Sequence, residues 1–190
     1  MNRRFNTTGV CIPHLHYMVD ITDKLRKIEK MVHSGDYFVI NRPRQYGKTT
    51  TMYMLEQALK DEYLILSISF EGVGDKFFEN EPEFTASFLR ILAKAAKYQN
   101  IEISEFIFQL SNGVNNFESL SEVITEITEK SEKSIILLID EVDKSSNNQL
   151  FLSFLGILRS KFLLMQQGKD KYNSPWNIAV NFNINMSFNA

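Results

Sequence analysis

A glycine-lysine-threonine triplet stands at the end of a short basic segment of the chain. The segment Tyr37–Thr50 reads YFVINRPRQYGKTT, so an apolar run leads through two arginines into the triplet. A nucleotide triphosphate is bound by inward-pointing backbone N–H groups, by the positive end of a helix and by a flexible cation. Gly47 permits a close backbone approach, Lys48 can reach the β- and γ-phosphates, and the Thr49 hydroxyl can hold Mg²⁺. The segment therefore predicts a phosphate-binding loop.

This loop departs from the general GxxxxGK[ST] pattern. Arg42 stands where the first glycine belongs, and Pro43 removes one backbone donor. Arg42 and Arg44 could contact phosphates, or Arg44 could simply be solvated. The triplet alone is a weak signal, but its place between an apolar strand and the start of a helix strengthens it. We expect Lys48 to be exposed at that helix start, without core contacts.

A second chemical signal lies in Ile135–Lys144, which reads IILLIDEVDK. Carboxylates at the edge of a core are costly unless they are paired or bound to a cation, so a buried strand that ends in two of them needs a reason. In a phosphate-loop ATPase the first acid, Asp140, lies by the Mg²⁺, and the second, Glu141, can polarise the attacking water as general base. The alternative is a strand that runs into an exposed acidic turn. The two motifs in this order favour nucleotide binding.

Other polar residues give weaker signals. His14 and His16 would share one face of a strand, but a metal site needs further ligands, so ordinary polar roles are favoured. Cys11 is interpreted as a buried, inert thiol. Glu71 could face the active site or lie in a surface turn. The aromatic residues over 77–117 have the spacing of a core and lack the interleaved cations of a base-stacking platform.

The elements that must position these residues alternate between strand and helix patterns. Strands are predicted over 37–40, 63–70 and 134–139. Helices are predicted over 20–33, 48–60, about 83–130 with breaks near 99–100 and 111–116, and 149–166. The unbroken apolar run of the third strand suits a central parallel strand that is covered on both faces. This alternation predicts an α/β domain with a mainly parallel sheet.

The end of the chain has a different pattern. From Ile178 to Phe188 apolar and polar residues alternate strictly. This alternation predicts a one-sided C-terminal strand or hairpin with an asparagine-rich outer face.

Composition sets limits on the class of protein. The chain has 190 residues, is 44% hydrophobic and carries a formal charge of -2, which fits one good-sized domain without a global field for nucleic acid. Its single cysteine allows no internal disulfide and suits a reducing compartment. No stretch reaches the roughly 20 apolar residues of a membrane span, and no apolar run follows the N-terminal arginines. We therefore expect a cytoplasmic protein without a membrane partner.

The two motifs resemble a known family, the AAA-ATPase-like proteins of bacteria. Their phosphate loop reads RPR-x-[FY]-GK-[ST], to which NRPRQYGKTT is similar, and LLIDEVDK matches their acidic strand. VCIPHLHYMVDITDKL is similar to the family's lead-in, near the nucleotide base, and YNSPWNIA to a segment farther along. The resemblance covers Val10 to about Met186 and implies a P-loop NTPase of three αβα layers that binds Mg-ATP. The residues it implies are Arg42, Pro43, Arg44, Gln45, Tyr46, Gly47, Lys48, Thr49 and Thr50 for the nucleotide, Thr49 and Asp140 for the metal, and Lys48 and Glu141 for catalysis.

The resemblance also implies features that are not visible in the sequence. Family members carry a further strand after the helix that follows the acidic strand, and its polar tip senses the γ-phosphate. Here Asp170 passes straight to Lys171, and neither a helical lid nor a nuclease-like C-terminal domain follows. Either the chain is a natural short form, or a segment is missing between Asp170 and Lys171. We favour the missing segment. The expected division is an ATPase-like domain over 1–170 and an appended β segment over 171–190.

The expected function is Mg-dependent ATP binding with slow hydrolysis, used to switch or power a protein partner or an oligomer. The alternative is a non-hydrolysing nucleotide-sensing module of a signalling or defence protein. Glu141 favours the enzyme, and the strand that is not visible favours the module. A DNA-binding, origin-recognition-like ATPase is disfavoured by the acidic balance, so nucleic acid is not an expected partner.

Overall fold

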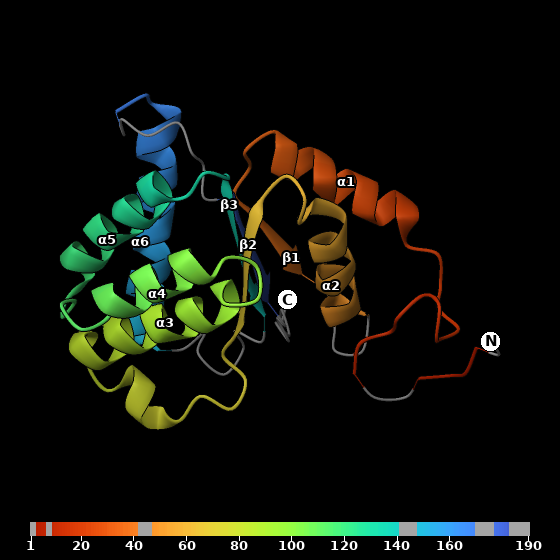
Figure 1. Cartoon of the computed structure of the whole chain (residues 1–190), viewed down its shortest axis with the longest axis horizontal. Coiled ribbons are helices and arrows are strands. Elements are labelled where there is room, and N and C mark those ends of the chain that lie inside the picture. Colours follow the sequence, from red (N-terminus) through yellow and green to blue (C-terminus); the bar gives the residue numbers. More distant parts are fainter. Residues whose placement is uncertain (1–2, 7–8, 42–46, 141–147, 170–176, 183–190) are drawn as a thin grey trace, which may run out of the picture.

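The computed structural model describes residues 3–6, 9–41, 47–140, 148–169 and 177–182, with the backbone alone for residues 41 and 177–182. Helices and strands alternate along the chain (Figure 1), which confirms the predicted α/β fold. The elements are α1 (Thr22–His33), β1 (Phe38–Asn41), α2 (Lys48–Leu59), β2 (Leu64–Ser69), the 3-10 helix η1 (Asp75–Phe78), α3 (Glu81–Ala96), α4 (Ile101–Leu110), α5 (Phe117–Lys130), β3 (Ile135–Asp140), α6 (Gln149–Gln166) and β4 (Asn177–Phe182).

The described strands form one parallel sheet in the order β1-β4-β3-β2. In β4, Val180 pairs with Val39 of β1 on one side and with Ile139 of β3 on the other. In β2, Ser69 pairs with Asp140, so these two strands end at the same level. Because all strands run in one direction, the ends of β1 and β3 that carry the two motifs meet at one edge of the sheet.

The position of β4 corrects the prediction for the end of the chain. Residues 177–182 form an inner strand with neighbours on both sides, where an appended, one-sided strand was expected. Alternating polarity describes which side chains suit water, but it does not limit how many backbone neighbours a strand can have. Along the chain, β4 follows α6, and α6 follows the acidic strand β3, so β4 stands where the family resemblance implies a further strand. The joint between Asp170 and Lys171, and with it the division at 170, lies outside the described residues.

Helices cover both faces of the sheet, with α1 and α2 on one face and α3 to α6 on the other (Figure 1). Side chains alternate along β3 between the two faces. Ile136 and Leu138 join a core cluster with α1 and α2, whereas Ile135, Leu137 and Ile139 join a larger cluster with α3 to α6. The strand is buried along its whole length. This confirms the prediction of a central strand covered on both faces.

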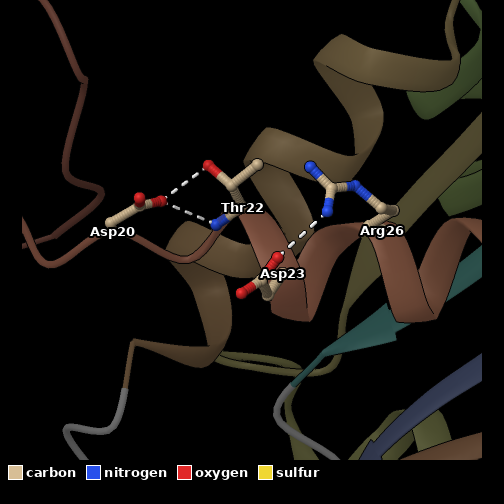
Figure 2. Close-up of polar contacts among 4 residues, drawn as sticks. All are labelled: Asp20, Thr22, Asp23 and Arg26. Atoms are coloured by element: carbon tan, nitrogen blue, oxygen red, sulfur yellow. Dashed lines mark hydrogen bonds and ion pairs between the residues drawn. The ribbon is translucent and has the colours of Figure 1, made fainter.

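Helix α1 begins beside two side-chain contacts that stabilise its first turn (Figure 2). The Asp20 carboxylate accepts hydrogen bonds from the Thr22 N–H at 2.9 Å and from the Thr22 hydroxyl at 2.6 Å. These bonds, led by the hydroxyl, hold the pKa of Asp20 below its ordinary value. Asp23, the next residue, forms an exposed ion pair with Arg26 one turn further along α1, at 3.0 Å. Both contacts are local to the first turns of α1 and lie at its surface.

The four helices on the other face each begin after an asparagine. The side chain of Asn80 accepts the Glu83 N–H at 2.9 Å at the start of α3, and Asn100, Asn116 and Asn148 cap α4, α5 and α6 in the same way. A side-chain oxygen at this position satisfies one of the N–H groups that the first turn of a helix leaves unpaired. Asparagine therefore fixes where these helices start.

Candidate functional site

The two halves of the predicted site meet through a hydrogen bond between α2 and β3. The Thr49 hydroxyl donates to Oδ2 of Asp140 at a distance of 3.1 Å. Thr49 is exposed on the first turn of α2, and Asp140 is the last residue of β3, with 8% of its surface accessible. A hydroxyl and a carboxylate are oxygen ligands of the kind that Mg²⁺ prefers. The structure thus brings together the two residues that were predicted to hold the metal, although they are far apart in the sequence.

The start of α2 differs from the starts of α3 to α6 because no side chain caps it. Its N-cap residue is Gly47, in the left-handed conformation at φ 69° and ψ 29°, and the first turn contains no acidic residue. Glycine adopts this conformation without the strain that a Cβ would add. The N–H groups of this turn are left without a capping side chain. They are available to an anion together with the positive end of the helix dipole.

Lys48 is buried, in contrast to the exposed position that was expected. Only 7% of its surface is accessible, and within the described part of the chain its Nζ is shielded from solvent and has no hydrogen-bond partner. The expectation was wrong because α2 starts at the edge of the sheet, so its first side chain lies against the protein instead of in solvent. A shielded ammonium without a partner is costly, since its desolvation is not compensated. Lys48 is therefore the described side chain that most needs an anion.

The hydroxyl groups of Thr50 and Thr51 form hydrogen bonds that stabilise the first turn of α2. The Thr50 hydroxyl accepts the Cys11 N–H at 3.0 Å, which ties the N-terminal segment to the helix. The Thr51 hydroxyl donates to the Gly47 carbonyl at 2.8 Å and accepts from Nζ of Lys24 at 2.8 Å. Thr50 was predicted to bind the nucleotide, whereas no role was predicted for Thr51 or Lys24. The only signal in the sequence was the row of three threonines after Lys48, because nothing local points to a lysine on α1.

The N-terminal segment is held by its own hydrogen bonds. Arg4 and His16 form a parallel bridge, and Nδ1 of the buried His16 accepts the Ile12 N–H at 2.9 Å. His14 is exposed. Across the described residues, no group of three His, Cys, Asp or Glu side chains could hold a metal ion. The interpretation of His16 as an ordinary polar residue agrees with these contacts.

The remaining predicted residues divide into two groups. Glu71 is exposed and donates its N–H to the Ser69 hydroxyl at 3.0 Å, which is the surface-turn alternative. Other members of the predicted site lie outside the described residues, so their assignment stays a prediction: Arg42, Pro43, Arg44, Gln45, Tyr46 and Glu141.

The described part of the chain is an α/β protein with a parallel sheet. At the carboxyl edge of this sheet, the first turn of α2 presents N–H groups that no side chain caps and that suit an anion. Comparison with known proteins gives the family. A family model described as an AAA-like domain matches residues 15–177, so this chain belongs to the AAA-like domain family. Neither a curated protein nor a solved structure gave a match. Membership of this family suggests a nucleotide-binding, ATPase-like function.

No helix among the described residues is both long enough and apolar enough to cross a bilayer.

Proposed function

We propose that this chain is a P-loop NTPase of the three-layer type that binds ATP with Mg²⁺ at the carboxyl edge of its sheet and hydrolyses it slowly. The single observation that carries the proposal is the shielded Nζ of Lys48, which has no partner among the described residues. It stands next in sequence to Thr49, whose hydroxyl is already bonded to Asp140. A cation that needs an anion thus lies next in sequence to Thr49, which with Asp140 forms a pair of oxygen ligands that suit a divalent metal.

The residues present fit a magnesium nucleotide. Lys48 and the uncapped N–H groups at the start of α2 would hold the phosphates, with the loop of residues 42–46 as further ligands. Thr49 and Asp140 would hold Mg²⁺, which would neutralise part of the charge of the phosphates. Glu141 would act as general base toward water. Within the chain, Thr51 and Lys24 keep Gly47 in place so that the first turn presents its donors.

The presence of β4 favours the enzyme over the nucleotide-sensing module. The module was favoured because no further strand was visible after the helix that follows the acidic strand. β4 occupies this place, with β1 on one side and β3 on the other. The sensing module remains the second candidate, and phosphate release is the property that separates the two. The partner that is switched or powered stays a proposal in either case.

Calorimetric titration with ATP and Mg²⁺ tests the binding part. Lys48→Ala should abolish binding, because it removes the buried cation that faces the phosphates. Lys60→Ala is the matched control, since Lys60 is exposed and lies at the far end of the same helix. Circular dichroism would confirm that both variants are folded. Parent-like affinity in Lys48→Ala would mean that the phosphate-loop assignment is wrong.

A phosphate-release assay tests the hydrolytic part. Glu141→Gln should keep the affinity for Mg-ATP, while turnover falls by about 10²-fold or more, as expected when a general base is lost. Asp140→Asn should instead weaken the Mg²⁺ dependence of binding. If the parent chain releases no phosphate above background and Glu141→Gln changes nothing, the nucleotide-sensing module is the better account.

A further inference from the structure

The outer edge of β2 is an edge of the sheet that faces no other described strand. β2 is the last strand in the sheet order, and the N–H of its first residue, Leu64, bonds to the Ser134 carbonyl at 3.0 Å on the β3 side. In a parallel strand, alternate residues direct both N–H and C=O to opposite sides. Ile65, Ser67 and Ser69 therefore direct their backbone groups outward, away from β3.

A glutamine side chain closes the first of these three positions. The Ile65 N–H donates to Oε1 of Gln99 at 3.0 Å, and Nε2 of Gln99 donates to the Ile65 carbonyl. The amide thus takes the place that a neighbouring strand would have at Ile65. Among the described residues, no hydrogen bond reaches the outward backbone groups of Ser67 or Ser69. Of the three outward-facing residues, Ile65 has its backbone groups hydrogen-bonded by a side chain, whereas Ser67 and Ser69 have none of these bonds among the described residues.

The open part of this edge lies in a groove between two helices. The groove has a volume of about 430 Å³ and runs between α2 on one side and α3 on the other. Tyr98, just after α3, is 94% exposed and lies in the wall of the groove. Unpaired strand edges are natural templates for another strand, and proteins usually cover them. Ser67 and Ser69 line this groove, so an extended chain that paired with them would lie between its walls.

The two walls of the groove carry opposite charges. Glu56 of α2 is half-buried, and burial raises the pKa of its carboxyl group, an effect that Lys60 opposes. Lys94 of α3 is exposed. Neither side chain has a hydrogen bond or an ion pair with another described residue. Side chains of an added strand would alternate between the α2 wall and the α3 wall, because successive residues point to opposite faces of a sheet.

We propose that this edge binds a short extended segment of a partner protein as an additional strand, with a basic residue toward Glu56 and an adjacent acidic residue toward Lys94. Backbone pairing with Ser67 and Ser69 supplies the affinity, and the two charges set the register. A second copy of this chain fits less well, because its own β2 edge lies equally between two helices and cannot enter the groove. The proposal is independent of the nucleotide site.

Fluorescence polarisation with a labelled, capped hexapeptide, TKEKVT, tests this proposal. Its lysines face one wall and its glutamate faces the other. The parent chain should bind it, and the same peptide N-methylated at its four central residues should not bind, because backbone pairing is blocked. Glu56→Gln and Lys94→Gln should each weaken binding by about two- to fivefold, with the loss smaller at high salt.

Variants of the edge itself give the sharper comparison. Ser67→Pro removes an outward N–H without removing a bond to β3, and it should lower the affinity by about fivefold or more, whereas Ser67→Thr should keep it. Gln99→Ala opens the edge at Ile65 and should bind the peptide more tightly, which provides a test even if the proline variant does not fold. Failure of the parent to bind would overturn the proposal. A dimer in sedimentation that Ser67→Pro disperses would also overturn it, in favour of a second copy.

Discussion

The two faces of the sheet are built from different kinds of residue. The face covered by α3 to α6 holds a large cluster of buried aliphatic and phenylalanine side chains, in which Phe84 alone contacts five other phenylalanine rings. The face covered by α1 and α2 has a smaller apolar cluster, and its neighbour at the sheet edge is a set of polar contacts around Lys48 and Thr51. Within the described part of the chain, the buried side-chain nitrogen without a hydrogen-bond partner, that of Lys48, lies beside the second face.

This difference indicates a division of labour between the faces. At α3 to α6, the asparagine oxygen satisfies part of the first turn within the protein. Helix α2 begins at Gly47 without such a cap, so the N–H groups of its first turn are available to water or to an anion. We infer that the face with α3 to α6 mainly stabilises the fold, and that the edge beside α2, where the Lys48 ammonium group is shielded, is suited to binding an anion at a cost in stability.

The largest effect should follow from a change on the aromatic face. Phe84→Ala should lower the free energy of unfolding by about 3 to 5 kcal/mol, because Phe84 is fully buried and a cavity would remain. Urea denaturation would measure the loss. Phe108→Ala, at a side chain that is 54% exposed, is the control and should cost far less. Equal losses would show that the aromatic cluster is not the main source of stability.

A change at the candidate site should raise the free energy of unfolding instead of lowering it. Lys48→Met should raise the free energy of unfolding of the ligand-free chain by about 1 to 3 kcal/mol, because an unpartnered buried polar group is replaced by an apolar one of similar length. The same variant should lose ATP binding, so added Mg-ATP should stabilise the parent alone. Thermal melts with and without Mg-ATP would show both effects. Destabilisation of the ligand-free variant would contradict the division of labour.

The smallest effect concerns Glu56 and depends on pH. Burial raises the pKa of Glu56 in the folded chain, so its contribution to stability is present below the pKa of the unfolded chain and is lost as the pH rises through the folded pKa. Lys60 on the same helix opposes this shift, and Lys94 lines the same groove. Glu56→Gln should therefore gain stability relative to the parent between about pH 4 and pH 7. Parallel stability curves for the two chains across this range would show that the carboxyl group is effectively solvated.

Much of the fold could be predicted from periodicity and turn residues. The three apolar runs lie at β1, β2 and β3, and the predicted helix breaks near 99–100 and 111–116 separate α3, α4 and α5. The place of β4 could not be predicted, because its pairing with β1 depends on residues far away in the chain. A pattern of side chains shows which residues suit water. The backbone partners of a strand depend on which other strands the fold places beside it.

The site shows the same limit. The two motifs predicted that Thr49 and Asp140 would serve one metal, and the structure places them in contact at 3.1 Å. The burial of Lys48 was missed, since residue type alone suggests a solvated lysine at a helix start. The support of Thr51 by Lys24 was also missed. This contact joins α1 to α2, and no local pattern encodes it.

The place of β4 also orders events during synthesis of the chain. β1 pairs with β4 and with no other described strand, so β1 has no partner in the sheet until residues 177–182 have left the ribosome. Before that point, a growing chain can pair β2 with β3 but cannot join them to the strand that leads into Lys48. The two motifs are thus synthesised before β4, but they come together in one sheet only after β4 has been synthesised. If the proposed site binds a nucleotide, a nascent chain should gain that capacity in one step once β4 has been synthesised, which makes nucleotide binding a sign that β1 has joined the sheet.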